Sequence, residues 1–384
     1  MQIPDIPILP PKSAAVAEDL KLLAVKLQSA QRPVILAGGG RWEVQDRNAL
    51  QACARKLNIP VLTAFRYHDL FDNTDPLFVG EAGVGMTANT KRLLTEADVV
   101  LAVNLRFGEM TTNAFTLFGA DRGAQWIAQS HRSGDEFHKY VAPNLSMISD
   151  PAPLLDGLRT RLEGQSMSQN PAWATSARAG FSAAQTAKPQ PSPVDMGVVT
   201  STLQAMLPAD AIVTNGAGNF AIWPNKFMQF SKHQRLLAPQ SGAMGYGLPA
   251  AIAAKVAYPE RCVVCFAGDG DFQMNGQELG AALQAGARPI VLIVNNGSYG
   301  TIRMHQERQY PRRVSGTDMI NPDFAALARA YGFHGERIER TEDFADAFSR
   351  ALESPNGAVL DLNVASEAIT PGLTIKDLQH LSDS

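Results

Sequence analysis

A carboxylate and a side-chain amide stand at the ends of two successive apolar runs in this chain. Asp269 follows the apolar residues 262–267 after a single glycine, and Asn296 closely follows the apolar residues 289–294. The residues between the two runs have a helical pattern, so the segment is predicted to form strand, helix and strand. In an open parallel sheet, ligands bind at the carboxyl ends of the strands. Mg²⁺ prefers carboxylate, amide and phosphate oxygens, so Asp269 and Asn296 are candidate metal ligands.

The residues around this carboxylate suit a phosphate group. Gly268 and Gly270 flank Asp269 and let the backbone approach a phosphate closely. The helix that follows points its N–H groups towards an anion, so we expect Gly270 and Asp271 to offer backbone N–H groups. The alternative is an ordinary strand–helix–strand unit whose turns carry an Asp and an Asn by chance.

Gly268-Asp269-Gly270 follows one apolar strand, and Asn295-Asn296 follows the next one along the chain. Together they resemble a known diphosphate-binding motif. It is the motif of thiamine diphosphate (ThDP) enzymes of the acetolactate synthase and pyruvate decarboxylase superfamily. The resemblance implies ThDP and Mg²⁺ as cofactors. It also implies a third protein ligand to the metal, the main-chain carbonyl of Ser298. Tyr299 and Gly300, which come next, join the expected cofactor-binding residues.

An upstream segment, residues 215–223, extends the resemblance. It holds a further glycine turn that opens a helix, and it resembles the acetolactate synthase segment in which Gly-Gln-His contacts the diphosphate. This implies contacts from Gly216, Gly218 and Asn219, whereas Phe220 cannot hydrogen-bond a phosphate. An ordinary helix start with an Asn cap is the alternative.

Residues 241–251 resemble the family run G-x-M-G-x-x-L-P-A-A. The resemblance implies that Met244 wedges under the cofactor and holds its two rings in a V. It also implies that the Gly242 carbonyl accepts a hydrogen bond from the amino group of the cofactor. Both are therefore expected catalytic residues, because the V replaces an external base by proximity. Without the resemblance, Met244 would be assigned to the core.

The substrate side is marked by Arg303 and His305, two basic side chains that follow the motif. Either could face the carboxylate of a 2-oxo acid, and we take His305 as the third catalytic candidate. In acetohydroxyacid synthases a Trp that biases the second substrate aligns with His305, so this particular reaction is not implied. The alternative is that both residues face solvent.

The alternation of strands and helices predicts an α/β fold with two doubly wound, mostly parallel-sheet domains. We expect a linker at residues 1–12, a Rossmann-like middle domain at 13–163, a linker at 164–193, a ThDP-binding domain at 194–366, and a polar tail at 367–384 that partly wraps a neighbour. Strands are expected at 32–37, 60–63, 98–104, 125–129, 145–149, 211–214, 235–237, 262–267, 289–294 and 358–363, and helices at 14–30, 44–57, 87–94 and 171–186.

Two weaker motifs favour other functions. The turn Gly38-Gly39-Gly40 follows a strand, but it is not G-x-G-x-x-G and has no well-placed ribose carboxylate. Binding of FAD or ADP by the middle domain is therefore possible but not favoured. An NAD- or FAD-dependent oxidoreductase would not explain the metal motif formed by Gly268-Asp269-Gly270 and Asn295-Asn296. Nor would it explain the Met244 segment. Cys262 and Cys265 lie three apart on a strand and point to opposite faces, which favours buried thiols over a redox or zinc pair.

The composition is that of a globular protein with room for two domains. Of 384 residues, 45% are hydrophobic and 18% charged, and the formal net charge is −3. This charge argues against nucleic acid or an anionic membrane as a partner. No apolar run is long enough to span a membrane and the N-terminus does not resemble a signal peptide, so we expect the cytoplasm.

One part of the resembled enzymes is not found. Their activating Glu belongs to a pyrimidine-binding domain that precedes the middle domain, and neither Glu81 nor Glu109 matches that role. We therefore expect a fragment, or one chain of a split homo-oligomeric enzyme completed by a separate pyrimidine-binding chain. Its expected activity is acetolactate synthase-like carboligation or decarboxylation of a small 2-oxo acid. The alternative is a non-catalytic ThDP-binding or subunit-interaction protein.

Overall fold

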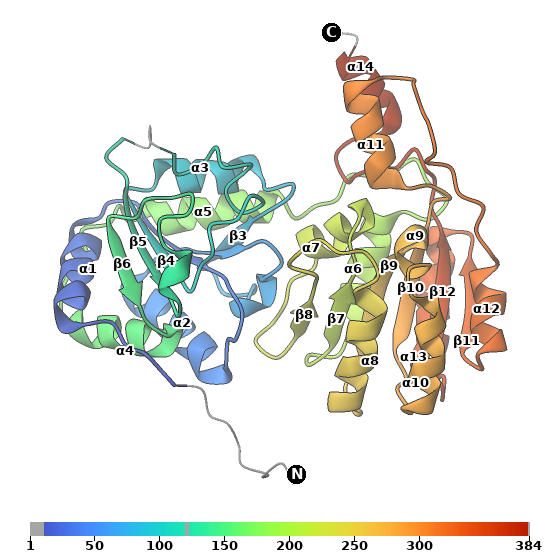
Figure 1. Cartoon of the computed structure of the whole chain (residues 1–384), viewed down its shortest axis with the longest axis horizontal. Helices are drawn as coiled ribbons and strands as arrows, with labels where there is room; N and C mark the ends of the chain where they lie inside the picture. Colours follow the sequence, from blue (N-terminus) through green and yellow to red (C-terminus); the bar gives the residue numbers. More distant parts are fainter. Residues whose placement is uncertain (1–10, 120–122, 383–384) are drawn as a thin grey trace. The chain divides into compact units, whose positions relative to one another are not determined.

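The computed structural model describes residues 11–119 and 123–382. The chain divides between Ser182 and Ala183 into two compact units. In the described residues each unit contains one six-stranded sheet with helices on both faces (Figure 1). The predicted fold class, an α/β protein with two doubly wound parallel-sheet domains, is confirmed. Of the predicted linker 1–12, residues 1–10 lie outside the described residues.

The sheet of the first unit has the strand order β3-β2-β1-β4-β5-β6. Its pairings are parallel throughout the described residues. The strands are β1 (Pro33–Ala37), β2 (Val61–Ala64), β3 (Phe78–Ala82), β4 (Val99–Val103), β5 (Trp126–His131) and β6 (Leu145–Ile148).

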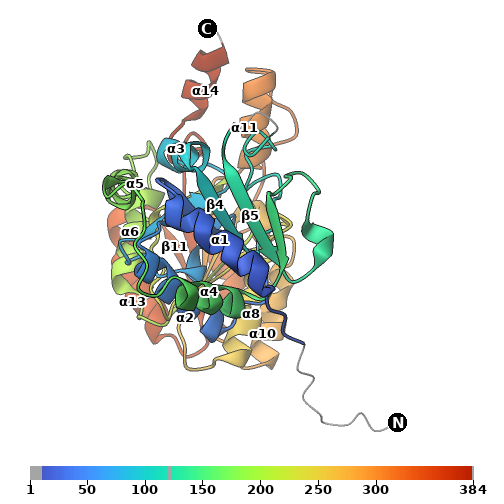
Figure 2. The same cartoon turned by 90° about the vertical axis from the view of Figure 1, so that its left-hand side faces the viewer.

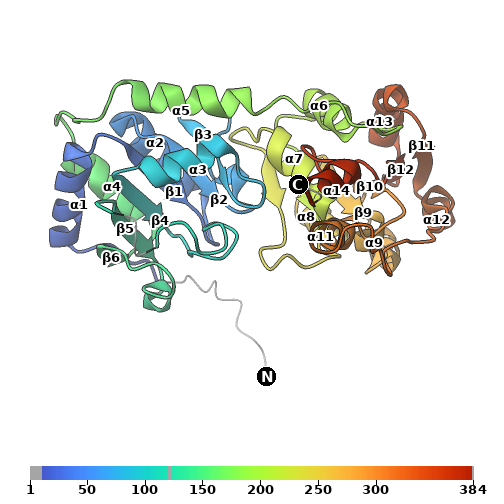
Figure 3. The ribbon, with the colours of Figure 1, turned by 90° about the horizontal axis from the view of Figure 1, so that it is seen from above.

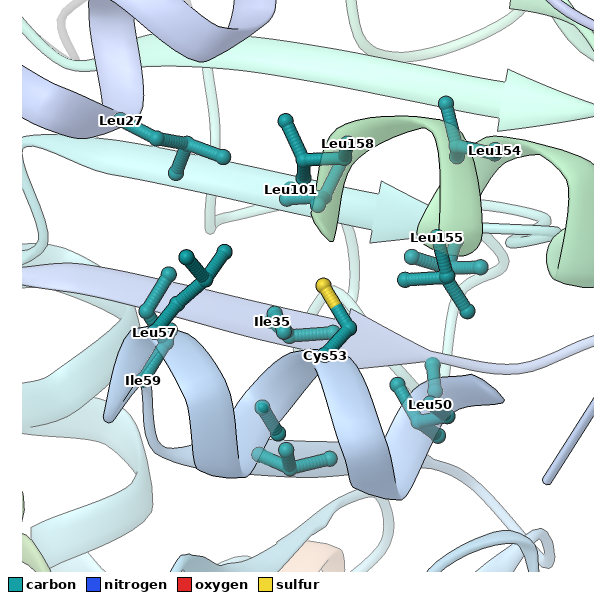
Figure 4. Packing of buried hydrophobic residues seen from close by; sticks show 14 of the residues in the cluster. Leu27, Ile35, Leu50, Cys53, Leu57, Ile59, Leu101, Leu154, Leu155 and Leu158 are labelled. Atoms are coloured by element: carbon teal, nitrogen blue, oxygen red, sulfur yellow. The ribbon is translucent and has the colours of Figure 1, made fainter. Parts of the chain in front are cut away.

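Helices cover both faces of this sheet, which is why its central strands are continuous apolar runs. The helices are α1 (Ala17–Ser29), α2 (Val44–Leu57), η1 (His68–Leu70), α3 (Ala88–Glu96), η2 (Gly134–Glu136), α4 (Pro151–Arg161) and α5 (Ala172–Ala183). α1, α2 and α4 lie on one face of the sheet (Figure 2), and Figure 4 shows some of their side chains packed together there. Side chains of α3 and α5 pack on the other.

The sheet of the second unit has the strand order β11-β12-β10-β9-β7-β8. Its pairings are parallel in the described residues. The strands are β7 (Ile212–Asn215), β8 (Arg235–Leu237), β9 (Val263–Gly268), β10 (Ile290–Asn295), β11 (His334–Ile338) and β12 (Ala358–Asn363). Gly268 pairs with Val294, so β9 and β10 end side by side.

Helices again form two layers in this unit, as Figure 3 shows from above. They are α6 (Met196–Met206), η3 (Asn219–Ala221), α7 (Ile222–Phe227), α8 (Gly247–Ala257), α9 (Asp269–Phe272), η4 (Gly276–Glu278), α10 (Leu279–Gln284), α11 (Gly300–Gln309), α12 (Phe324–Ala330), η5 (Thr341–Asp343), α13 (Phe344–Glu353) and α14 (Ile375–Ser382). α6, α7 and α13 pack on one face of the sheet. α8, α10 and α12 pack on the other.

Two strands were not predicted, and both lie at an edge of their sheet. β3 ends the first sheet and β11 ends the second. β11, with the sequence His-Gly-Glu-Arg-Ile, buries only its last residue fully. An edge strand is covered on fewer sides than a central one, so it need not be an apolar run.

The C-terminal segment packs on its own unit over the described residues 367–382, and the prediction that this polar tail partly wraps a neighbour stays a prediction. Its helix α14 lies against α11. A small apolar cluster joins them, formed by Met304, Ile369, Ile375 and Leu378.

Of the two cysteines predicted to be buried thiols, Cys265 is buried and Cys262 is half-buried. Cys265 packs in the cluster on the α8 side of the sheet, whereas Cys262 packs against the cluster on the α6 side. Burial raises the pKa of Cys265 to about 12 and that of Cys262 to about 11. Both are free, as is the buried Cys53.

Across the described residues, no helix is both long and apolar enough to cross a membrane.

Candidate functional site

The two halves of the metal motif meet at the carboxyl ends of β9 and β10. Asp269 begins α9 immediately after β9 and is only 3% exposed. Its Oδ1 accepts a hydrogen bond from the Gly270 N–H at 2.9 Å, and its Oδ2 accepts one from the Gly297 N–H at 2.8 Å. The second of these bonds crosses from one half of the motif to the other.

Burial raises the pKa of the Asp269 carboxyl. Hydrogen bonds from Asn321 and from the Gly270 and Gly297 N–H groups act in the opposite direction, since they favour the ionised form. Removal from water penalises an ionised carboxylate, and a bound cation would offset this penalty. The environment of Asp269 therefore fits a metal ligand.

Asn296 and Ser298 lie in the tight turn that follows β10. The Asn296 Oδ1 accepts a hydrogen bond from the Ser298 N–H at 3.0 Å, and the Ser298 carbonyl accepts one from the Gly300 N–H at 2.8 Å. Gly297, at φ +63°, has the left-handed backbone conformation that glycine adopts most easily. Each of the two oxygens keeps a second lone pair, so both fit the predicted role of metal ligand.

No group of three or more His, Cys, Asp and Glu side chains in the described part of the chain could hold a metal ion. A cation at Asp269 would therefore need amide and carbonyl oxygens from the protein and further oxygens from a ligand. This is the ligand set of a hard cation bound together with a phosphate group.

The motif glycines are required by close contacts inside the unit. A Cβ atom on Gly216 would lie 2.0 Å from the Asp271 Oδ1. A Cβ on Gly268 would lie 2.8 Å from the Phe220 ring, and one on Gly270 would lie 2.7 Å from the Tyr299 ring. These contacts explain the glycines without a ligand, so their predicted contact with a diphosphate stays a prediction.

Asp271 has a side-chain role that the sequence did not reveal. Its carboxylate is 3% exposed and accepts hydrogen bonds from the Ala217 N–H at 3.0 Å and the Gly245 N–H at 2.8 Å. It therefore ties together the three segments that the resemblance assigned to the cofactor. Its predicted backbone contact with a diphosphate stays a prediction.

The predicted wedge residue is not part of the core of its unit. The Met244 side chain is 39% exposed. It follows Gly242, which has φ +73° and whose N–H donates to the Pro239 carbonyl at 3.0 Å. The Asn275 amide donates to the Gly245 carbonyl and holds the other end of this loop. Met244 is therefore presented on a braced loop, as a residue that contacts a ligand would be.

Asn219 is bonded to the C-terminal segment and to α11. Its amide donates to the Ile369 carbonyl at 3.0 Å, and its Oδ1 accepts from the Thr301 hydroxyl at 3.0 Å. The predicted hydrogen bond from Asn219 to a phosphate would have to coexist with these bonds or replace them. Phe220 is a buried apolar residue that packs against the glycine turns.

The two basic residues of α11 have different surroundings. Arg303 forms an ion pair with Glu307 at 2.8 Å, and the Glu307 side chain is fully buried. His305 is exposed, and its side chain makes no hydrogen bond or ion pair with any residue that the structure describes. Of the two, His305 is thus the side chain left available for a substrate carboxylate, and that role stays a prediction.

A polar network behind Asp269 also escaped the sequence analysis. Asn321 donates to the Asp269 Oδ2 at 2.8 Å and to the Asn295 Oδ1 at 2.9 Å. Asn295 in turn donates to the Asp361 Oδ1 at 2.9 Å. Asn321 lies in the loop before α12, where no periodic pattern marks it.

In the first unit, the turn Gly38-Gly39-Gly40, considered above as a nucleotide site, is held by internal contacts. Asn104 and Arg132 each donate to the Gly40 carbonyl at 3.0 Å. A Cβ on Gly39 would lie 2.0 Å from the Asn104 carbonyl oxygen. Gly38 and Gly39 thus serve internal packing, whereas a Cβ on Gly40 would meet nothing within 4 Å. The prediction that FAD or ADP is not favoured here stays a prediction.

Each of the two units matches a known family of domains. The family described as "Thiamine pyrophosphate enzyme, C-terminal TPP binding domain" matches residues 216–362. The "Thiamine pyrophosphate enzyme, central domain" matches residues 20–158. The chain belongs to the thiamine pyrophosphate enzyme family. Thiamine pyrophosphate is another name for ThDP, and Asp269, Asn296 and Ser298 all fall inside the matched ThDP-binding domain.

Curated relatives of this chain are named acetolactate synthases. The large subunit from Parasynechococcus marenigrum (strain WH8102) is 32% identical over 92% of this chain and 57% of its own length. The large subunit from Cyanidium caldarium is 28% identical over 94% of this chain and 61% of its own. The isozyme 3 large subunit from Escherichia coli (strain K12) is 30% identical over 85% and 58%. The chain thus spans less than two thirds of these relatives.

Proposed function

We propose that this chain binds the diphosphate of ThDP through Mg²⁺ and serves an acetolactate synthase-like enzyme that acts on small 2-oxo acids. The family assignment and the names of the relatives support this proposal. The observation that carries it is the buried Asp269 carboxylate, bonded across the ends of β9 and β10 to the turn that holds Asn296 and Ser298.

The protein residues divide the work of holding the cofactor. Asp269, the Asn296 amide oxygen and the Ser298 carbonyl would bind the cation, and diphosphate oxygens and water would complete its shell. When bound, ThDP supplies the electron sink for breaking or forming the bond next to a carbonyl group. Met244 and the Gly242 carbonyl would orient its ring system, which contributes by proximity rather than by adding an external base.

Apolar side chains around the site favour a protein partner. Met244, Tyr246 and Met274 are 39%, 39% and 52% exposed, and Ile320, next to Asn321, is fully exposed. We propose that this rim meets the pyrimidine-binding part of the enzyme, in a homo-oligomer or on a separate chain. That part would supply the activating glutamate implied by the resemblance.

Calorimetric titration of ThDP in the presence and absence of Mg²⁺ tests the cofactor site. We expect Mg²⁺-dependent binding to the wild-type chain, weakened more than about 100-fold by Asp269→Asn, since the loss of a metal ligand exceeds that of an outer-shell partner. Asp346→Asn removes the same charge from the exposed face of α13 and should bind like wild type. Binding of equal strength to all three proteins would contradict the assignment.

Turnover separates the enzyme from the non-catalytic alternative. With ThDP, Mg²⁺ and a pyrimidine-binding domain present, we expect pyruvate to be consumed with release of CO₂. Tight ThDP binding without consumption of pyruvate or another small 2-oxo acid would instead favour a cofactor-binding or subunit-interaction protein.

A further inference from the structure

Two buried carboxyl groups of the second unit are joined by a chain of two side-chain amides. Asp269 accepts from Asn321 at 2.8 Å, the Asn295 Oδ1 accepts from the same Asn321 nitrogen at 2.9 Å, and Asp361 accepts from Asn295 at 2.9 Å. The Asn321 Oδ1 accepts from Gln273 at 2.9 Å. These side chains come from β9–α9, the loop before α12, the end of β10, and β12.

Asp361 lies at the end of this chain, inside the sheet. It pairs with Ile293 of β10 and is 1% exposed. Its Oδ2 is buried without a hydrogen-bond partner among the described residues. A buried polar atom without a partner costs stability, so packing alone would favour an apolar residue at this position.

The chain of hydrogen bonds has a direction. The Asp361 Oδ1 accepts, so Asn295 must turn its NH₂ group towards it and its carbonyl oxygen towards Asn321. Asn321 must then present its NH₂ group, whose two hydrogens serve Asn295 and Asp269. The partner at the far end therefore selects the orientation of Asn295, and it favours the same orientation of Asn321 that Asp269 and Gln273 require.

We propose that Asp361 is a positioning residue for the metal site, acting through Asn295 and Asn321 on the Asp269 carboxylate. By the hydrogen bonds described above, the Asp269 Oδ2 accepts from both Asn321 and Gly297, whereas its Oδ1 accepts from Gly270. The carboxylate is thereby fixed in rotation, and Oδ1 keeps the freer lone pair for a cation. This inference rests on the proposed function of the site.

We call the hydrogen-bond chain from Asp361 through Asn295 and Asn321 to Asp269 the relay. Exchanging the Asp and the Asn at positions 361 and 295 conserves the charge and tests the direction of the relay. Asp361→Asn places an NH₂ group inside the network. If this group faces Asn295, the amides of Asn295 and Asn321 must both reverse. If it does not, it stays buried without an acceptor. Adding Asn295→Asp restores the direction, because the new carboxylate accepts from both of its neighbours. We expect Asp361→Asn to weaken Mg²⁺ binding at saturating ThDP about tenfold. The double variant should return to within about threefold of wild type.

Three measurements decide the outcome: calorimetric Mg²⁺ affinity, ThDP affinity, and thermal unfolding of the cofactor-free chain. A lowered unfolding temperature with unchanged Mg²⁺ affinity would show a merely structural role and overturn the proposal. So would a double variant that binds no more tightly than Asp361→Asn. If Asp361→Asn does not fold, Asn321→Ala in the loop removes the last donor and must itself weaken Mg²⁺ binding about tenfold.

Wild-type behaviour separates this inference from the function on which it rests. A wild-type chain without Mg²⁺-dependent ThDP binding would overturn the proposed function, and the relay with it. A wild-type chain that binds, beside relay variants that bind equally well, would overturn the relay alone.

Discussion

At the residue scale, the Gly-Asp-Gly-Asp segment gives two neighbouring carboxylates different tasks. Asp269 faces the turn after β10 through Gly297, whereas Asp271 faces the loops that hold Ala217 and Gly245. Residues two apart at the start of a helix point in different directions, so one segment can serve both sides. Asp269 is left to meet a cation while Asp271 holds the surrounding loops together.

The contact between Gly216 and Asp271 leads to a first prediction. Gly216→Ala would place a Cβ 2.0 Å from the Asp271 Oδ1, so the loop or the carboxylate must move. We expect a loss of about 3 kcal/mol in unfolding free energy, as for an overpacked core, together with weaker ThDP binding. Urea unfolding measures the first effect.

Gly280→Ala is the matched control. It adds the same methyl group inside α10, where the nearest atom would lie at an ordinary 3.5 Å. It should leave stability unchanged or raise it by about 0.5 to 1 kcal/mol, because Ala favours a helix. Equal unfolding free energies for both variants would refute the role of this contact.

The three free thiols, two buried and one half-buried, allow a second prediction at this scale. Burial raises the pKa of Cys53 and of Cys265 to about 12, and that of Cys262 to about 11, so almost no thiolate exists at pH 8. We expect no appreciable alkylation of the native protein by iodoacetamide at pH 8, and complete alkylation after unfolding in guanidinium. Rapid modification of native Cys265, seen by mass spectrometry, would be inconsistent with its burial.

The site illustrates what sequence reasoning can and cannot find. Asp269 and Asn296 were predicted because they follow apolar strands with a known spacing. Asn321 and Asp361 were missed, because one lies in an irregular loop and the other inside a strand. Their importance arises from hydrogen bonds between segments far apart in the sequence, and no local pattern records such bonds.

At the element scale, central strands were easier to predict than edge strands. β1, β4, β9 and β10 are covered on both faces and paired on both sides, so each is an apolar run. β3 contains Gly80 and Glu81, and β11 is largely polar. These two edge strands therefore lack the apolar run that marks a central strand, whereas the other two edge strands, β6 and β8, were predicted.

The C-terminal helix α14 is attached to the site through α11. Their shared cluster includes Met304, Ile369 and Ile375, and the Ile369 carbonyl also accepts from Asn219. Docking of this segment and the orientation of Asn219 are therefore linked.

A third prediction follows from this small cluster. Ile375 is 7% exposed, and Ile375→Ala should remove about 2 kcal/mol of packing energy from the α11–α14 contact. We expect faster proteolytic cleavage within residues 367–382, with little change in the cleavage of β9 and β10. Limited proteolysis with mass spectrometry measures this, with Lys376→Ala, an exposed neighbour on the same helix, as the control. Unchanged cleavage of the segment in Ile375→Ala would show that the cluster does not hold α14.

At the scale of the whole molecule, two α/β units of similar construction differ in what their strand ends carry. In the first unit, the glycine turn after β1 makes internal contacts: its Gly40 carbonyl accepts hydrogen bonds from Asn104 and Arg132. The second brings a carboxylate, an amide and a main-chain carbonyl together at the ends of β9 and β10. The periodicity of strands and helices sufficed to predict both units, whereas the difference between them depends on a few residues at strand ends.

The fourth prediction tests the central claim, that a cation and the ThDP diphosphate meet at Asp269. The direct measurement is the anomalous difference density of crystals grown with ThDP and Mn²⁺, which takes the same oxygen ligands as Mg²⁺. We predict a peak about 2.1 Å from the Asp269 Oδ1, the Asn296 Oδ1 and the Ser298 carbonyl oxygen, with the diphosphate beside it. Two results would contradict the account: ordered ThDP with the Mn²⁺ peak at another place, or ThDP bound where neither it nor the Mn²⁺ contacts Asp269.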